Sequence, residues 1–232
     1  MRQARKASAS IGALLMVGLV LSACSNDNET SSGPSGTTAP SGATAPQINA
    51  TDFTADFSVM EQLTGLAAQG TGMIGVLLPD TTTSTRYVQY DAPYLQQAFE
   101  AAGLSSDQFK IDNAQGDANT MQTQAEADIN AGASVLLIDG IDSSSGAAIA
   151  QKAASQGVAV IDYDRLNSGG PADRYYVSFN NVEVGQTMGQ GLVDCITAWS
   201  LKDPNILIMD GDPTDNNAKL FADGYNGVLQ PY

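Results

Sequence analysis

The sequence of 232 residues contains no histidine, only two cysteines and a single tryptophan. Without histidine a Ser-His catalytic triad cannot form, and the commonest general base and metal ligand are missing. Two cysteines cannot build a structural zinc site of the usual Cys/His kind. These absences argue against most hydrolases and against zinc modules, and they leave no catalytic residue, metal or cofactor to be expected.

Basic residues are also scarce, because 10 Lys and Arg stand against 25 Asp and Glu, which gives a formal net charge of −15. A chain with this charge repels phosphate backbones, so nucleic acid is not expected as a partner. The segment Gly70-Thr71-Gly72 does not follow a predicted strand and therefore does not read as a phosphate-binding loop.

The first 23 residues have the order of a secretory signal peptide. Three basic residues precede an apolar run over 11–20, which is shorter than the ~20 residues of a permanent membrane span. The next residues, Leu21-Ser22-Ala23-Cys24, resemble a bacterial lipobox, in which the cysteine becomes the lipidated first residue of the mature protein. An ordinary signal with a chance cysteine is the alternative, but the order of the segments favours the lipobox. We expect a lipoprotein anchored outside the cytoplasm, at the cell surface or in the periplasm.

Cleavage before Cys24 would remove three basic residues and no acid, so the mature chain has a net charge of about −18. With Cys24 lipidated, Cys195 has no partner for a disulfide. Its neighbours Val193 and Ile196 predict that Cys195 fills a buried apolar position.

Two segments separate the signal from the main body. Residues 24–50 are rich in Ser, Thr, Gly, Ala and Pro, which bury too little apolar surface to offset their ordering entropy, so we predict a disordered tether. Residues 51–69 are predicted to be a helical prelude, because apolar side chains recur at helical spacing. These side chains are Phe53, Phe57, Met60, Leu63 and Leu66.

From residue 72 onward, strand and helix patterns alternate. Apolar runs typical of buried strands occupy residues 73–78, 109–111, 134–138, 158–161, 175–178 and 205–209. Helical periodicity occupies residues 87–102, 118–131, 143–156, 182–199 and 215–228. The alternation predicts an α/β fold with a parallel sheet flanked by helices, in which ligands bind at the carboxyl ends of the strands.

Polar residues follow the predicted strands where such a ligand would bind. The richest ends are Asp162-Tyr163-Asp164-Arg165 and residues 211–219. Carboxylates accept hydrogen bonds from hydroxyl groups, arginine donates hydrogen bonds in a planar fork, and an aromatic ring covers the C–H face of a sugar. The mixture suits a hydroxyl-rich ligand, although the residues alone leave a local ion pair or turn cap equally open for Asp164-Arg165. Asp139 and Asp142 could pair as acid and base, but a strand-end and a helix-cap carboxylate are the simpler interpretation.

Three motifs resemble the type I periplasmic binding proteins for monosaccharides. Residues 158–165 (VAVIDYDR) resemble that family's strand end V-x-x-Y-D-R. Residues 176–185 (YVSFNNVEVG) resemble the pattern Y-[VI]-S-F-D-N-x-x-V-G of its xylose-binding branch, and residues 211–221 (GDPTDNNAKLF) resemble G-x-P-x-D-N-N-A-K-L-F. The resemblance runs from about Met73 to Tyr232.

The resemblance implies a set of sugar-binding residues that come from two lobes. They are Arg86, Tyr87, Asp164, Arg165, Asp215, Asn217 and Lys219. Arg86 and Tyr87 match an R-W pair, with the arginine as hydroxyl donor and the aromatic as ring cover, and Lys219 either contacts the sugar or pairs with Asp215. Tyr87 replaces the family's tryptophan, which weakens the case for stacking, and Asn180 replaces its aspartate, which indicates a structural role there.

The resemblance also divides the folded part into an N-terminal α/β lobe, residues 70–179, and the start of a C-terminal α/β lobe, residues 180–232. Residues 227–232 match the middle of the family's second lobe, so we expect that lobe to be incomplete in this sequence. For the same reason we expect the 232-residue chain alone to bind sugar weakly or not at all.

The function implied is that of a solute-binding lipoprotein, which captures a xylose-like or related sugar for an ABC importer without catalysis. Its partners would be the permease, the ATPase and the membrane. Delivery of sugar occupancy to a membrane receptor is one alternative. An extracellular sugar-acting α/β enzyme is another, against which the missing histidine argues. The signal peptide excludes a cytoplasmic repressor of the same fold.

Overall fold

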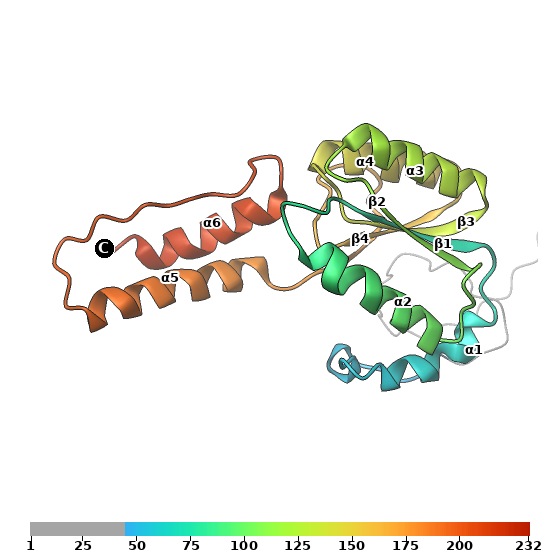
Figure 1. Cartoon of the computed structure of the whole chain (residues 1–232), viewed down its shortest axis with the longest axis horizontal. Coiled ribbons are helices and arrows are strands. Elements are labelled where there is room, and N and C mark those ends of the chain that lie inside the picture. Colours follow the sequence, from blue (N-terminus) through green and yellow to red (C-terminus); the bar gives the residue numbers. More distant parts are fainter. Residues whose placement is uncertain (1–44) are drawn as a thin grey trace, which may run out of the picture. The chain divides into compact units, whose positions relative to one another are not determined.

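A computed structural model describes residues 45–232 (Figure 1). The predicted signal peptide, Cys24 and most of the predicted tether lie outside the described residues. Within the described part, no helix combines the length and the apolar character that crossing a membrane requires.

The prelude is helical in three short pieces instead of one continuous helix. They are the 3₁₀ helices η1 (Ala50–Asp52) and η2 (Ser58–Leu63) and the single turn α1 (Thr64–Ala67). Asp56 interrupts the run, because its carboxylate accepts hydrogen bonds from the Thr54 hydroxyl and the Ser58 N–H. Phe57, at a φ of +56°, then turns the chain away from helical geometry.

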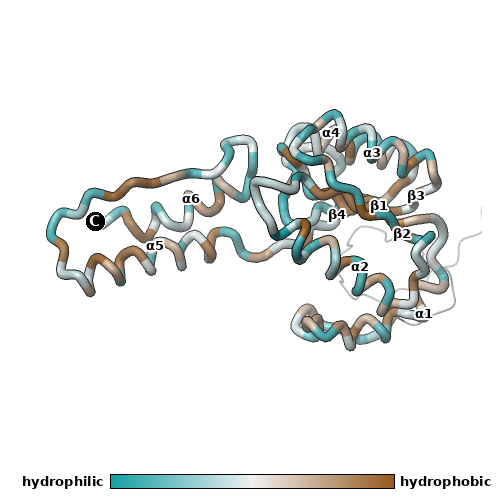
Figure 2. Tube along the Cα trace, viewed as in Figure 1, coloured by the Kyte–Doolittle hydropathy of each residue, from teal (hydrophilic) through white to brown (hydrophobic). Residues whose placement is uncertain are grey.

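Five parallel strands form one sheet in the order β2-β1-β3-β4-β5. Their bounds are β1 Met73–Leu78, β2 Phe109–Asn113, β3 Ala133–Ile138, β4 Ala159–Tyr163 and β5 Tyr175–Val177. The predicted α/β class, the parallel sheet and the positions of these strands are confirmed. In Figure 2 hydrophobic stretches meet in the middle of the sheet, around β1 and β4.

Helices cover both faces of the sheet, with α2 (Ala92–Ala101) on one side and α3 (Ala118–Asn130) and α4 (Ser143–Ser155) on the other (Figure 1). Side chains of β1 alternate between the two faces. Leu77 joins the core beneath α3 and α4, whereas Val76 and Leu78 join the core beneath α2. The sheet is therefore rigidly packed on both sides, which fixes where its strand ends point.

The C-terminal residues form two helices, α5 (Asn181–Ala198) and α6 (Asn216–Leu229), which pack against each other. Glycines permit this close approach, because a Cβ at Gly185 would overlap the backbone of Phe221, and a Cβ at Gly224 would overlap the backbone of Val182. Both helices were predicted within one or two residues of their observed ends.

Two sequence predictions for this part are wrong. Residues 205–209 form no strand, and Leu207 and Met209 are each 88% exposed. An apolar run becomes a strand only where another strand pairs with its backbone, and none of the five described strands does so. Cys195 is exposed rather than buried, because it lies on a different face of α5 from its buried neighbours Val193 and Ile196.

Candidate functional site

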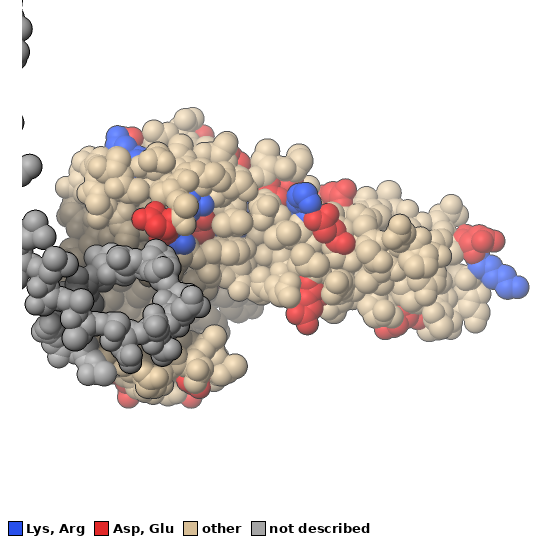
Figure 3. Space-filling model, turned by 180° about the vertical axis from the view of Figure 1, so that it is seen from behind, with Lys and Arg blue, Asp and Glu red and all other residues tan. Residues whose placement is uncertain are grey.

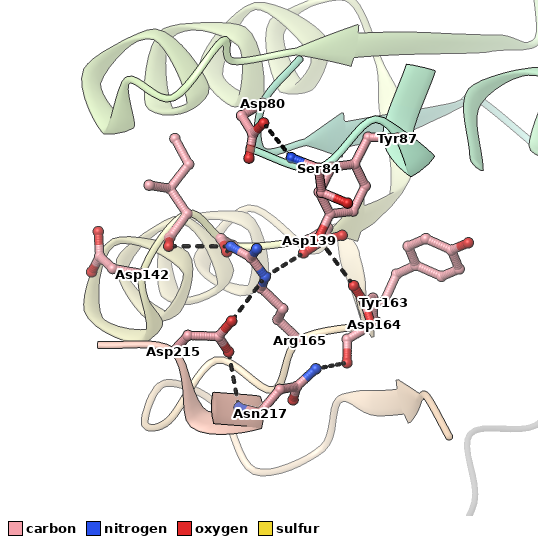
Figure 4. Close-up of polar contacts among 12 residues, drawn as sticks. Asp80, Ser84, Tyr87, Asp139, Asp142, Tyr163, Asp164, Arg165, Asp215 and Asn217 are labelled. Atoms are coloured by element: carbon pink, nitrogen blue, oxygen red, sulfur yellow. Dashed lines mark hydrogen bonds and ion pairs between the residues drawn. The ribbon is translucent and has the colours of Figure 1, made fainter. Parts of the chain in front are cut away.

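Side chains from the ends of three strands and from the start of α6 meet at one edge of the sheet (Figure 4). The register of β3 and β4 pairs Ile138 with Asp162, so the residues that follow them leave the sheet at the same level. This places Asp139, Asp164 and Arg165 together, as parallel strand ends require. We call this group, with Arg86, Tyr87, Asp215 and Asn217, the strand-end cluster.

Asp80 stabilises the loop that connects β1 to Arg86. Its carboxylate accepts hydrogen bonds from the N–H groups of Thr82 (2.9 Å) and Thr83 (2.8 Å). This is the local turn chemistry that an aspartate with following threonines favours. The loop then enters the π-helical turn η3 (Tyr87–Asp91), with Arg86 at its start.

Asp164 is the centre of the cluster. Arg86 Nη1 lies 3.3 Å from its Oδ2, and the Tyr87 hydroxyl donates to the same oxygen at 3.2 Å. Asp164 is only 5% exposed, and its Oδ1 has no hydrogen-bond partner among the described residues. Burial raises the pKa of Asp164 above its ordinary value, against the lowering effect of Arg86, the Tyr87 hydrogen bond and Arg165.

The backbone at Asp164 is turned sharply to present this side chain. Its φ is +62°, and the Arg165 N–H donates to the Tyr163 carbonyl at 2.7 Å across it. This is a tight three-residue turn, and aspartate tolerates the left-handed region better than most residues. The turn directs Asp164 and Arg165 into the cluster together.

Arg165 connects the N-terminal residues with α6. Its Nε lies 3.2 Å from Asp215 Oδ2 and 3.6 Å from Asp139 Oδ1. Its Nη1 donates to the Gly140 carbonyl at 3.2 Å. Its guanidinium carbon is 5.8 Å from the centre of the Tyr87 ring, and that of Arg86 is 5.2 Å away. Tyr87 is only 3% exposed, and both guanidiniums lie over its ring, which is the aromatic surface predicted to cover a sugar.

The start of α6 reaches the cluster through Asp215 and Asn217. Asp215 caps the helix by accepting the Asn217 N–H at 2.9 Å, and Asn217 Nδ2 donates to the Asp164 carbonyl at 3.0 Å. Lys219 lies apart: it is exposed, and its ion pair is with Asp223 at 2.6 Å. The predicted alternative that Lys219 pairs with Asp215 is therefore wrong. Asn180 is structural as predicted, because it caps α5 by accepting the Glu183 N–H.

The sequence did not point to Asp91, it gave Tyr163 no role within its strand end, and it left Asp139 as a simple strand-end carboxylate. Asp91 takes both a bidentate ion pair from Arg86 and a hydrogen bond from Tyr163. Asp139 is completely buried, and burial raises its pKa well above the ordinary value. An aspartate directly after an apolar strand is a signal that could have placed Asp139 in the cluster. Asp142 caps α4, as the simpler interpretation predicted.

The cluster gathers donors and acceptors that suit hydroxyl groups. Two guanidiniums donate, while Asp164 and Asp139 retain carboxylate oxygens without hydrogen-bond partners among the described residues. On the face drawn in Figure 3, basic side chains lie beside acidic ones and gather into no basic patch. The geometry therefore favours a polar, hydroxyl-bearing ligand over a polyanion.

Comparisons with known proteins identify the family and the fold. A family model described as a periplasmic binding protein domain matches residues 74–232. The multiple sugar-binding periplasmic protein SbpA of Azospirillum brasilense is 35% identical over 166 residues, which are 71% of this chain and 45% of that protein. The multiple sugar-binding periplasmic receptor ChvE of Rhizobium radiobacter is 35% identical over 163 residues, 69% of this chain and 44% of that protein.

A solved structure resembles the fold as well. The ABC transporter solute-binding protein from Clostridium phytofermentans with bound β-D-glucose has a TM-score of 0.63 and 32% identity, and the match covers 69% of this chain and 48% of that one. This chain spans about half the length of the curated relatives it matches. The comparisons confirm the family resemblance indicated by the sequence motifs and the type I binding-protein fold.

Proposed function

The chain belongs to the periplasmic binding protein family, and we propose that it captures a monosaccharide outside the cytoplasm for an ABC importer. The xylose-like motif at residues 176–185 and the nearly identical match at 211–221 favour a pentose or related aldose. The role is capture without catalysis, which agrees with relatives that are named as sugar-binding proteins.

The observation that carries the proposal is the meeting of Arg86, Asp164 and Arg165 at one sheet edge. Arg86 and Arg165 point donors at the cluster, and Asp164 keeps one buried oxygen without a hydrogen-bond partner among the described residues. A sugar offers hydroxyl groups that both donate and accept, so neighbouring hydroxyls can satisfy an arginine and a carboxylate at once. In this proposal Tyr87, Asn217 and Asp215 complete the site, and Lys219 acts at its margin.

Capture would couple to closure between the N-terminal lobe and the lobe that begins with α5. Arg165 and Asp164 already contact Asp215 and Asn217 across this boundary. A sugar between them would exchange direct contacts for contacts through its hydroxyls, and a closed form would then dock on a permease driven by its ATPase. Lipidation at Cys24 would keep the protein near that permease.

A sensory function is the second candidate, because ChvE is named as a receptor as well as a sugar-binding protein. The same site would then report sugar occupancy to a membrane receptor. Affinity capture from membranes of the producing cells distinguishes the two. A permease supports transport, and a receptor kinase as the bound membrane partner supports sensing.

Asp164→Asn tests the site in a version of the protein with the second lobe restored, because we expect the 232-residue chain alone to bind sugar weakly or not at all. Asparagine keeps the volume and tolerates the left-handed backbone but loses the charged acceptor. We expect sugar affinity to fall about tenfold or more, since a hydrogen bond to a charged group contributes roughly 1.5–3 kcal/mol. Isothermal titration with a panel of pentoses and hexoses measures this effect.

Asp173→Asn is the matched control, because Asp173 is exposed on the loop after β4 and loses the same charge. Its affinity should equal that of the wild type. If Asp164→Asn binds every sugar as tightly as the wild type, the site lies elsewhere. If the wild type binds none of the sugars, the proposed function is wrong.

A further inference from the structure

A buried carboxylate from a π-helical turn holds the guanidinium of Arg86. We infer that Asp91 is a positioning residue for the sugar site, which fixes Arg86 so that its remaining donors face Asp164. The inference rests on the proposed function and extends it to a residue that makes no contact with the cluster except through Arg86. Three observations support this inference. They are the five-residue spacing of Arg86 and Asp91, the hydrogen bonds to both carboxylate oxygens of Asp91, and the position of Tyr163 next to Asp164 at the end of β4.

The spacing of Arg86 and Asp91 is five residues, which an α-helix would not bring together. At 3.6 residues per turn, two such residues are about 140° apart around the helix axis. Helical partners are normally three or four residues apart. Here the Ala92 N–H bonds to the Tyr87 carbonyl five residues earlier, so the turn is π-helical. The wider turn takes one extra residue and brings Asp91 round to the side of Arg86.

The contacts of Asp91 use both of its oxygens. Arg86 Nε donates to Oδ2 at 2.8 Å and Arg86 Nη2 donates to Oδ1 at 2.7 Å, which is the bidentate geometry of a strong pair. The Tyr163 hydroxyl also donates to Oδ1, at 2.5 Å. Arg86 Nη1 is left for Asp164, 3.3 Å away. Asp91 is 6% exposed, so its effect on a sugar passes through Arg86.

Asp91 is held in its ionised form in this position. Burial acts to raise its pKa, but hydrogen bonds from Arg86 and Tyr163 outweigh burial, and the pKa is lowered. A permanently charged carboxylate behind Arg86 keeps the long arginine side chain in one rotamer before any ligand arrives. A site that is ordered in advance loses less conformational entropy when it binds.

Tyr163 connects Asp91 to the strand that precedes Asp164. It is the last residue of β4, and Asp164 follows it directly. The hydroxyl of Tyr163 therefore fixes Asp91 relative to the same strand end that presents the sugar-binding carboxylate. The distance between Arg86 and Asp164 is therefore fixed by two contacts of Asp91, one with Arg86 and one with Tyr163.

The test is a double-mutant cycle in the full-length protein, with wild type, Asp91→Asn, Arg86→Met and the double variant titrated with a sugar that the wild type binds. Asp91→Asn should weaken binding about tenfold, in line with the cost of ordering one long side chain on binding. In the Arg86→Met background the same change should have almost no further effect, because its target is gone. An equal loss in both backgrounds, or no loss in either, overturns the inference.

Two further variants separate positioning from a general loss of structure. Glu100→Gln removes one exposed carboxylate from α2, the helix that follows the π-helical turn, and should leave affinity unchanged. Tyr163→Phe removes only the hydroxyl that supports Asp91, and it remains informative if Asp91→Asn does not fold. It should weaken binding in the same direction by a smaller factor, again only while Arg86 is present. An effect of Tyr163→Phe that persists in Arg86→Met contradicts the inference.

A measurement without sugar completes the design. Nitrogen-15 NMR should show the Arg86 Nε–H exchanging slowly in the wild type and quickly in Asp91→Asn. An Arg86 Nε–H that stays equally protected in Asp91→Asn overturns the inference, whatever the affinities. If the wild type binds no sugar, the proposed function is wrong, and so is the role of Asp91 at a sugar site. The NMR measurement still decides whether Asp91 orders the Arg86 side chain.

Discussion

The Asp139 side chain is the most unusual single residue of the cluster. It is completely buried, neither oxygen has a hydrogen-bond partner among the described residues, and the nearest cation, Arg165, is 3.6 Å away. Burial and the neighbouring charge of Asp164 raise its pKa, and Arg165 offsets them only in part. Because the charged form is disfavoured in the fold, Asp139 should cost stability at neutral pH.

Replacement by a neutral isostere tests this cost. Asp139→Asn should be more stable than the wild type by about 1–3 kcal/mol at pH 7, because the neutral amide removes a buried charge that Arg165 offsets only in part. The folded pKa is raised, so the stability linked to Asp139 is fully present below the unfolded pKa of about 3.9 and is lost as pH rises through the folded pKa. The advantage of the variant should therefore vanish toward pH 4.

Urea unfolding of both proteins at several pH values between 4 and 7 measures the difference. Other titrating groups are shared and cancel. A difference that does not change with pH, or a wild type that is the more stable protein at pH 7, contradicts the account of Asp139.

The sequence predicts the place of a residue in the cluster only where that place follows from the residue's position beside a strand or within a motif. Asp164 and Arg165 follow directly after a strand, so position in the chain predicted their place in the cluster. Asp215 was expected there because of the motif at residues 211–221, since the strand predicted before it at 205–209 does not form. Asp91 could not be found this way, because its link to Arg86 needs a π-helical turn that no periodic pattern announces. Lys219 shares the motif of its neighbours but pairs on the outer side of α6.

Helix caps fix the ends of the elements that carry the cluster. The Asp142 carboxylate accepts the N–H groups of Ser144 at 3.0 Å and Ser145 at 2.9 Å, and so starts α4 directly after the Asp139 strand end. The four unpaired N–H groups at a helix start are the reason such a residue stabilises it. The turn between β3 and α4 depends on this carboxylate.

Asp142→Ala should lower the free energy of unfolding by about 1 kcal/mol, the typical cost of a lost N-cap. Asp142→Asn is the matched control, because asparagine caps about as well as aspartate and loses only the charge. Chemical denaturation compares the three proteins. Equal loss in both variants would show that charge, and not capping, is what Asp142 contributes.

The elements also show where periodicity succeeds and where it does not. The helices α3, α4, α5 and α6 follow a pattern that their own residues create, and they were predicted nearly to the residue. The helix predicted at 87–102 is divided, because residues 87–91 form the π-helical turn η3 and α2 begins at Ala92. Residues 205–209 have the composition of a strand, but a strand depends on a partner elsewhere in the chain. A local pattern cannot supply that partner, which is why this prediction failed while the helices succeeded.

At the scale of the whole molecule, the site depends on contacts between segments far apart in the sequence. Arg86 follows the first strand, Asp164 and Arg165 follow the fourth, and Asp215 and Asn217 begin the last helix. The Arg165–Asp215 ion pair and the hydrogen bond from Asn217 to the Asp164 carbonyl join the start of α6 to the carboxyl ends of the strands. In the proposed capture mechanism, ligand binding at this junction would couple to closure of the predicted second lobe.

The anchor proposed at Cys24 would place this body at a membrane. The predicted tether, residues 24–50, would give the body reach above the membrane. Cys24→Ala should abolish lipidation, so the protein would lose its partition into the detergent phase or keep an uncleaved signal.

Cys195→Ala is the matched control, because Cys195 lies on α5 outside the lipobox, and this variant should partition like the wild type. Detergent phase separation and mass spectrometry of the N-terminal peptide measure both variants. A Cys24→Ala protein that still carries a lipid at its N-terminus would show that the anchor is attached elsewhere.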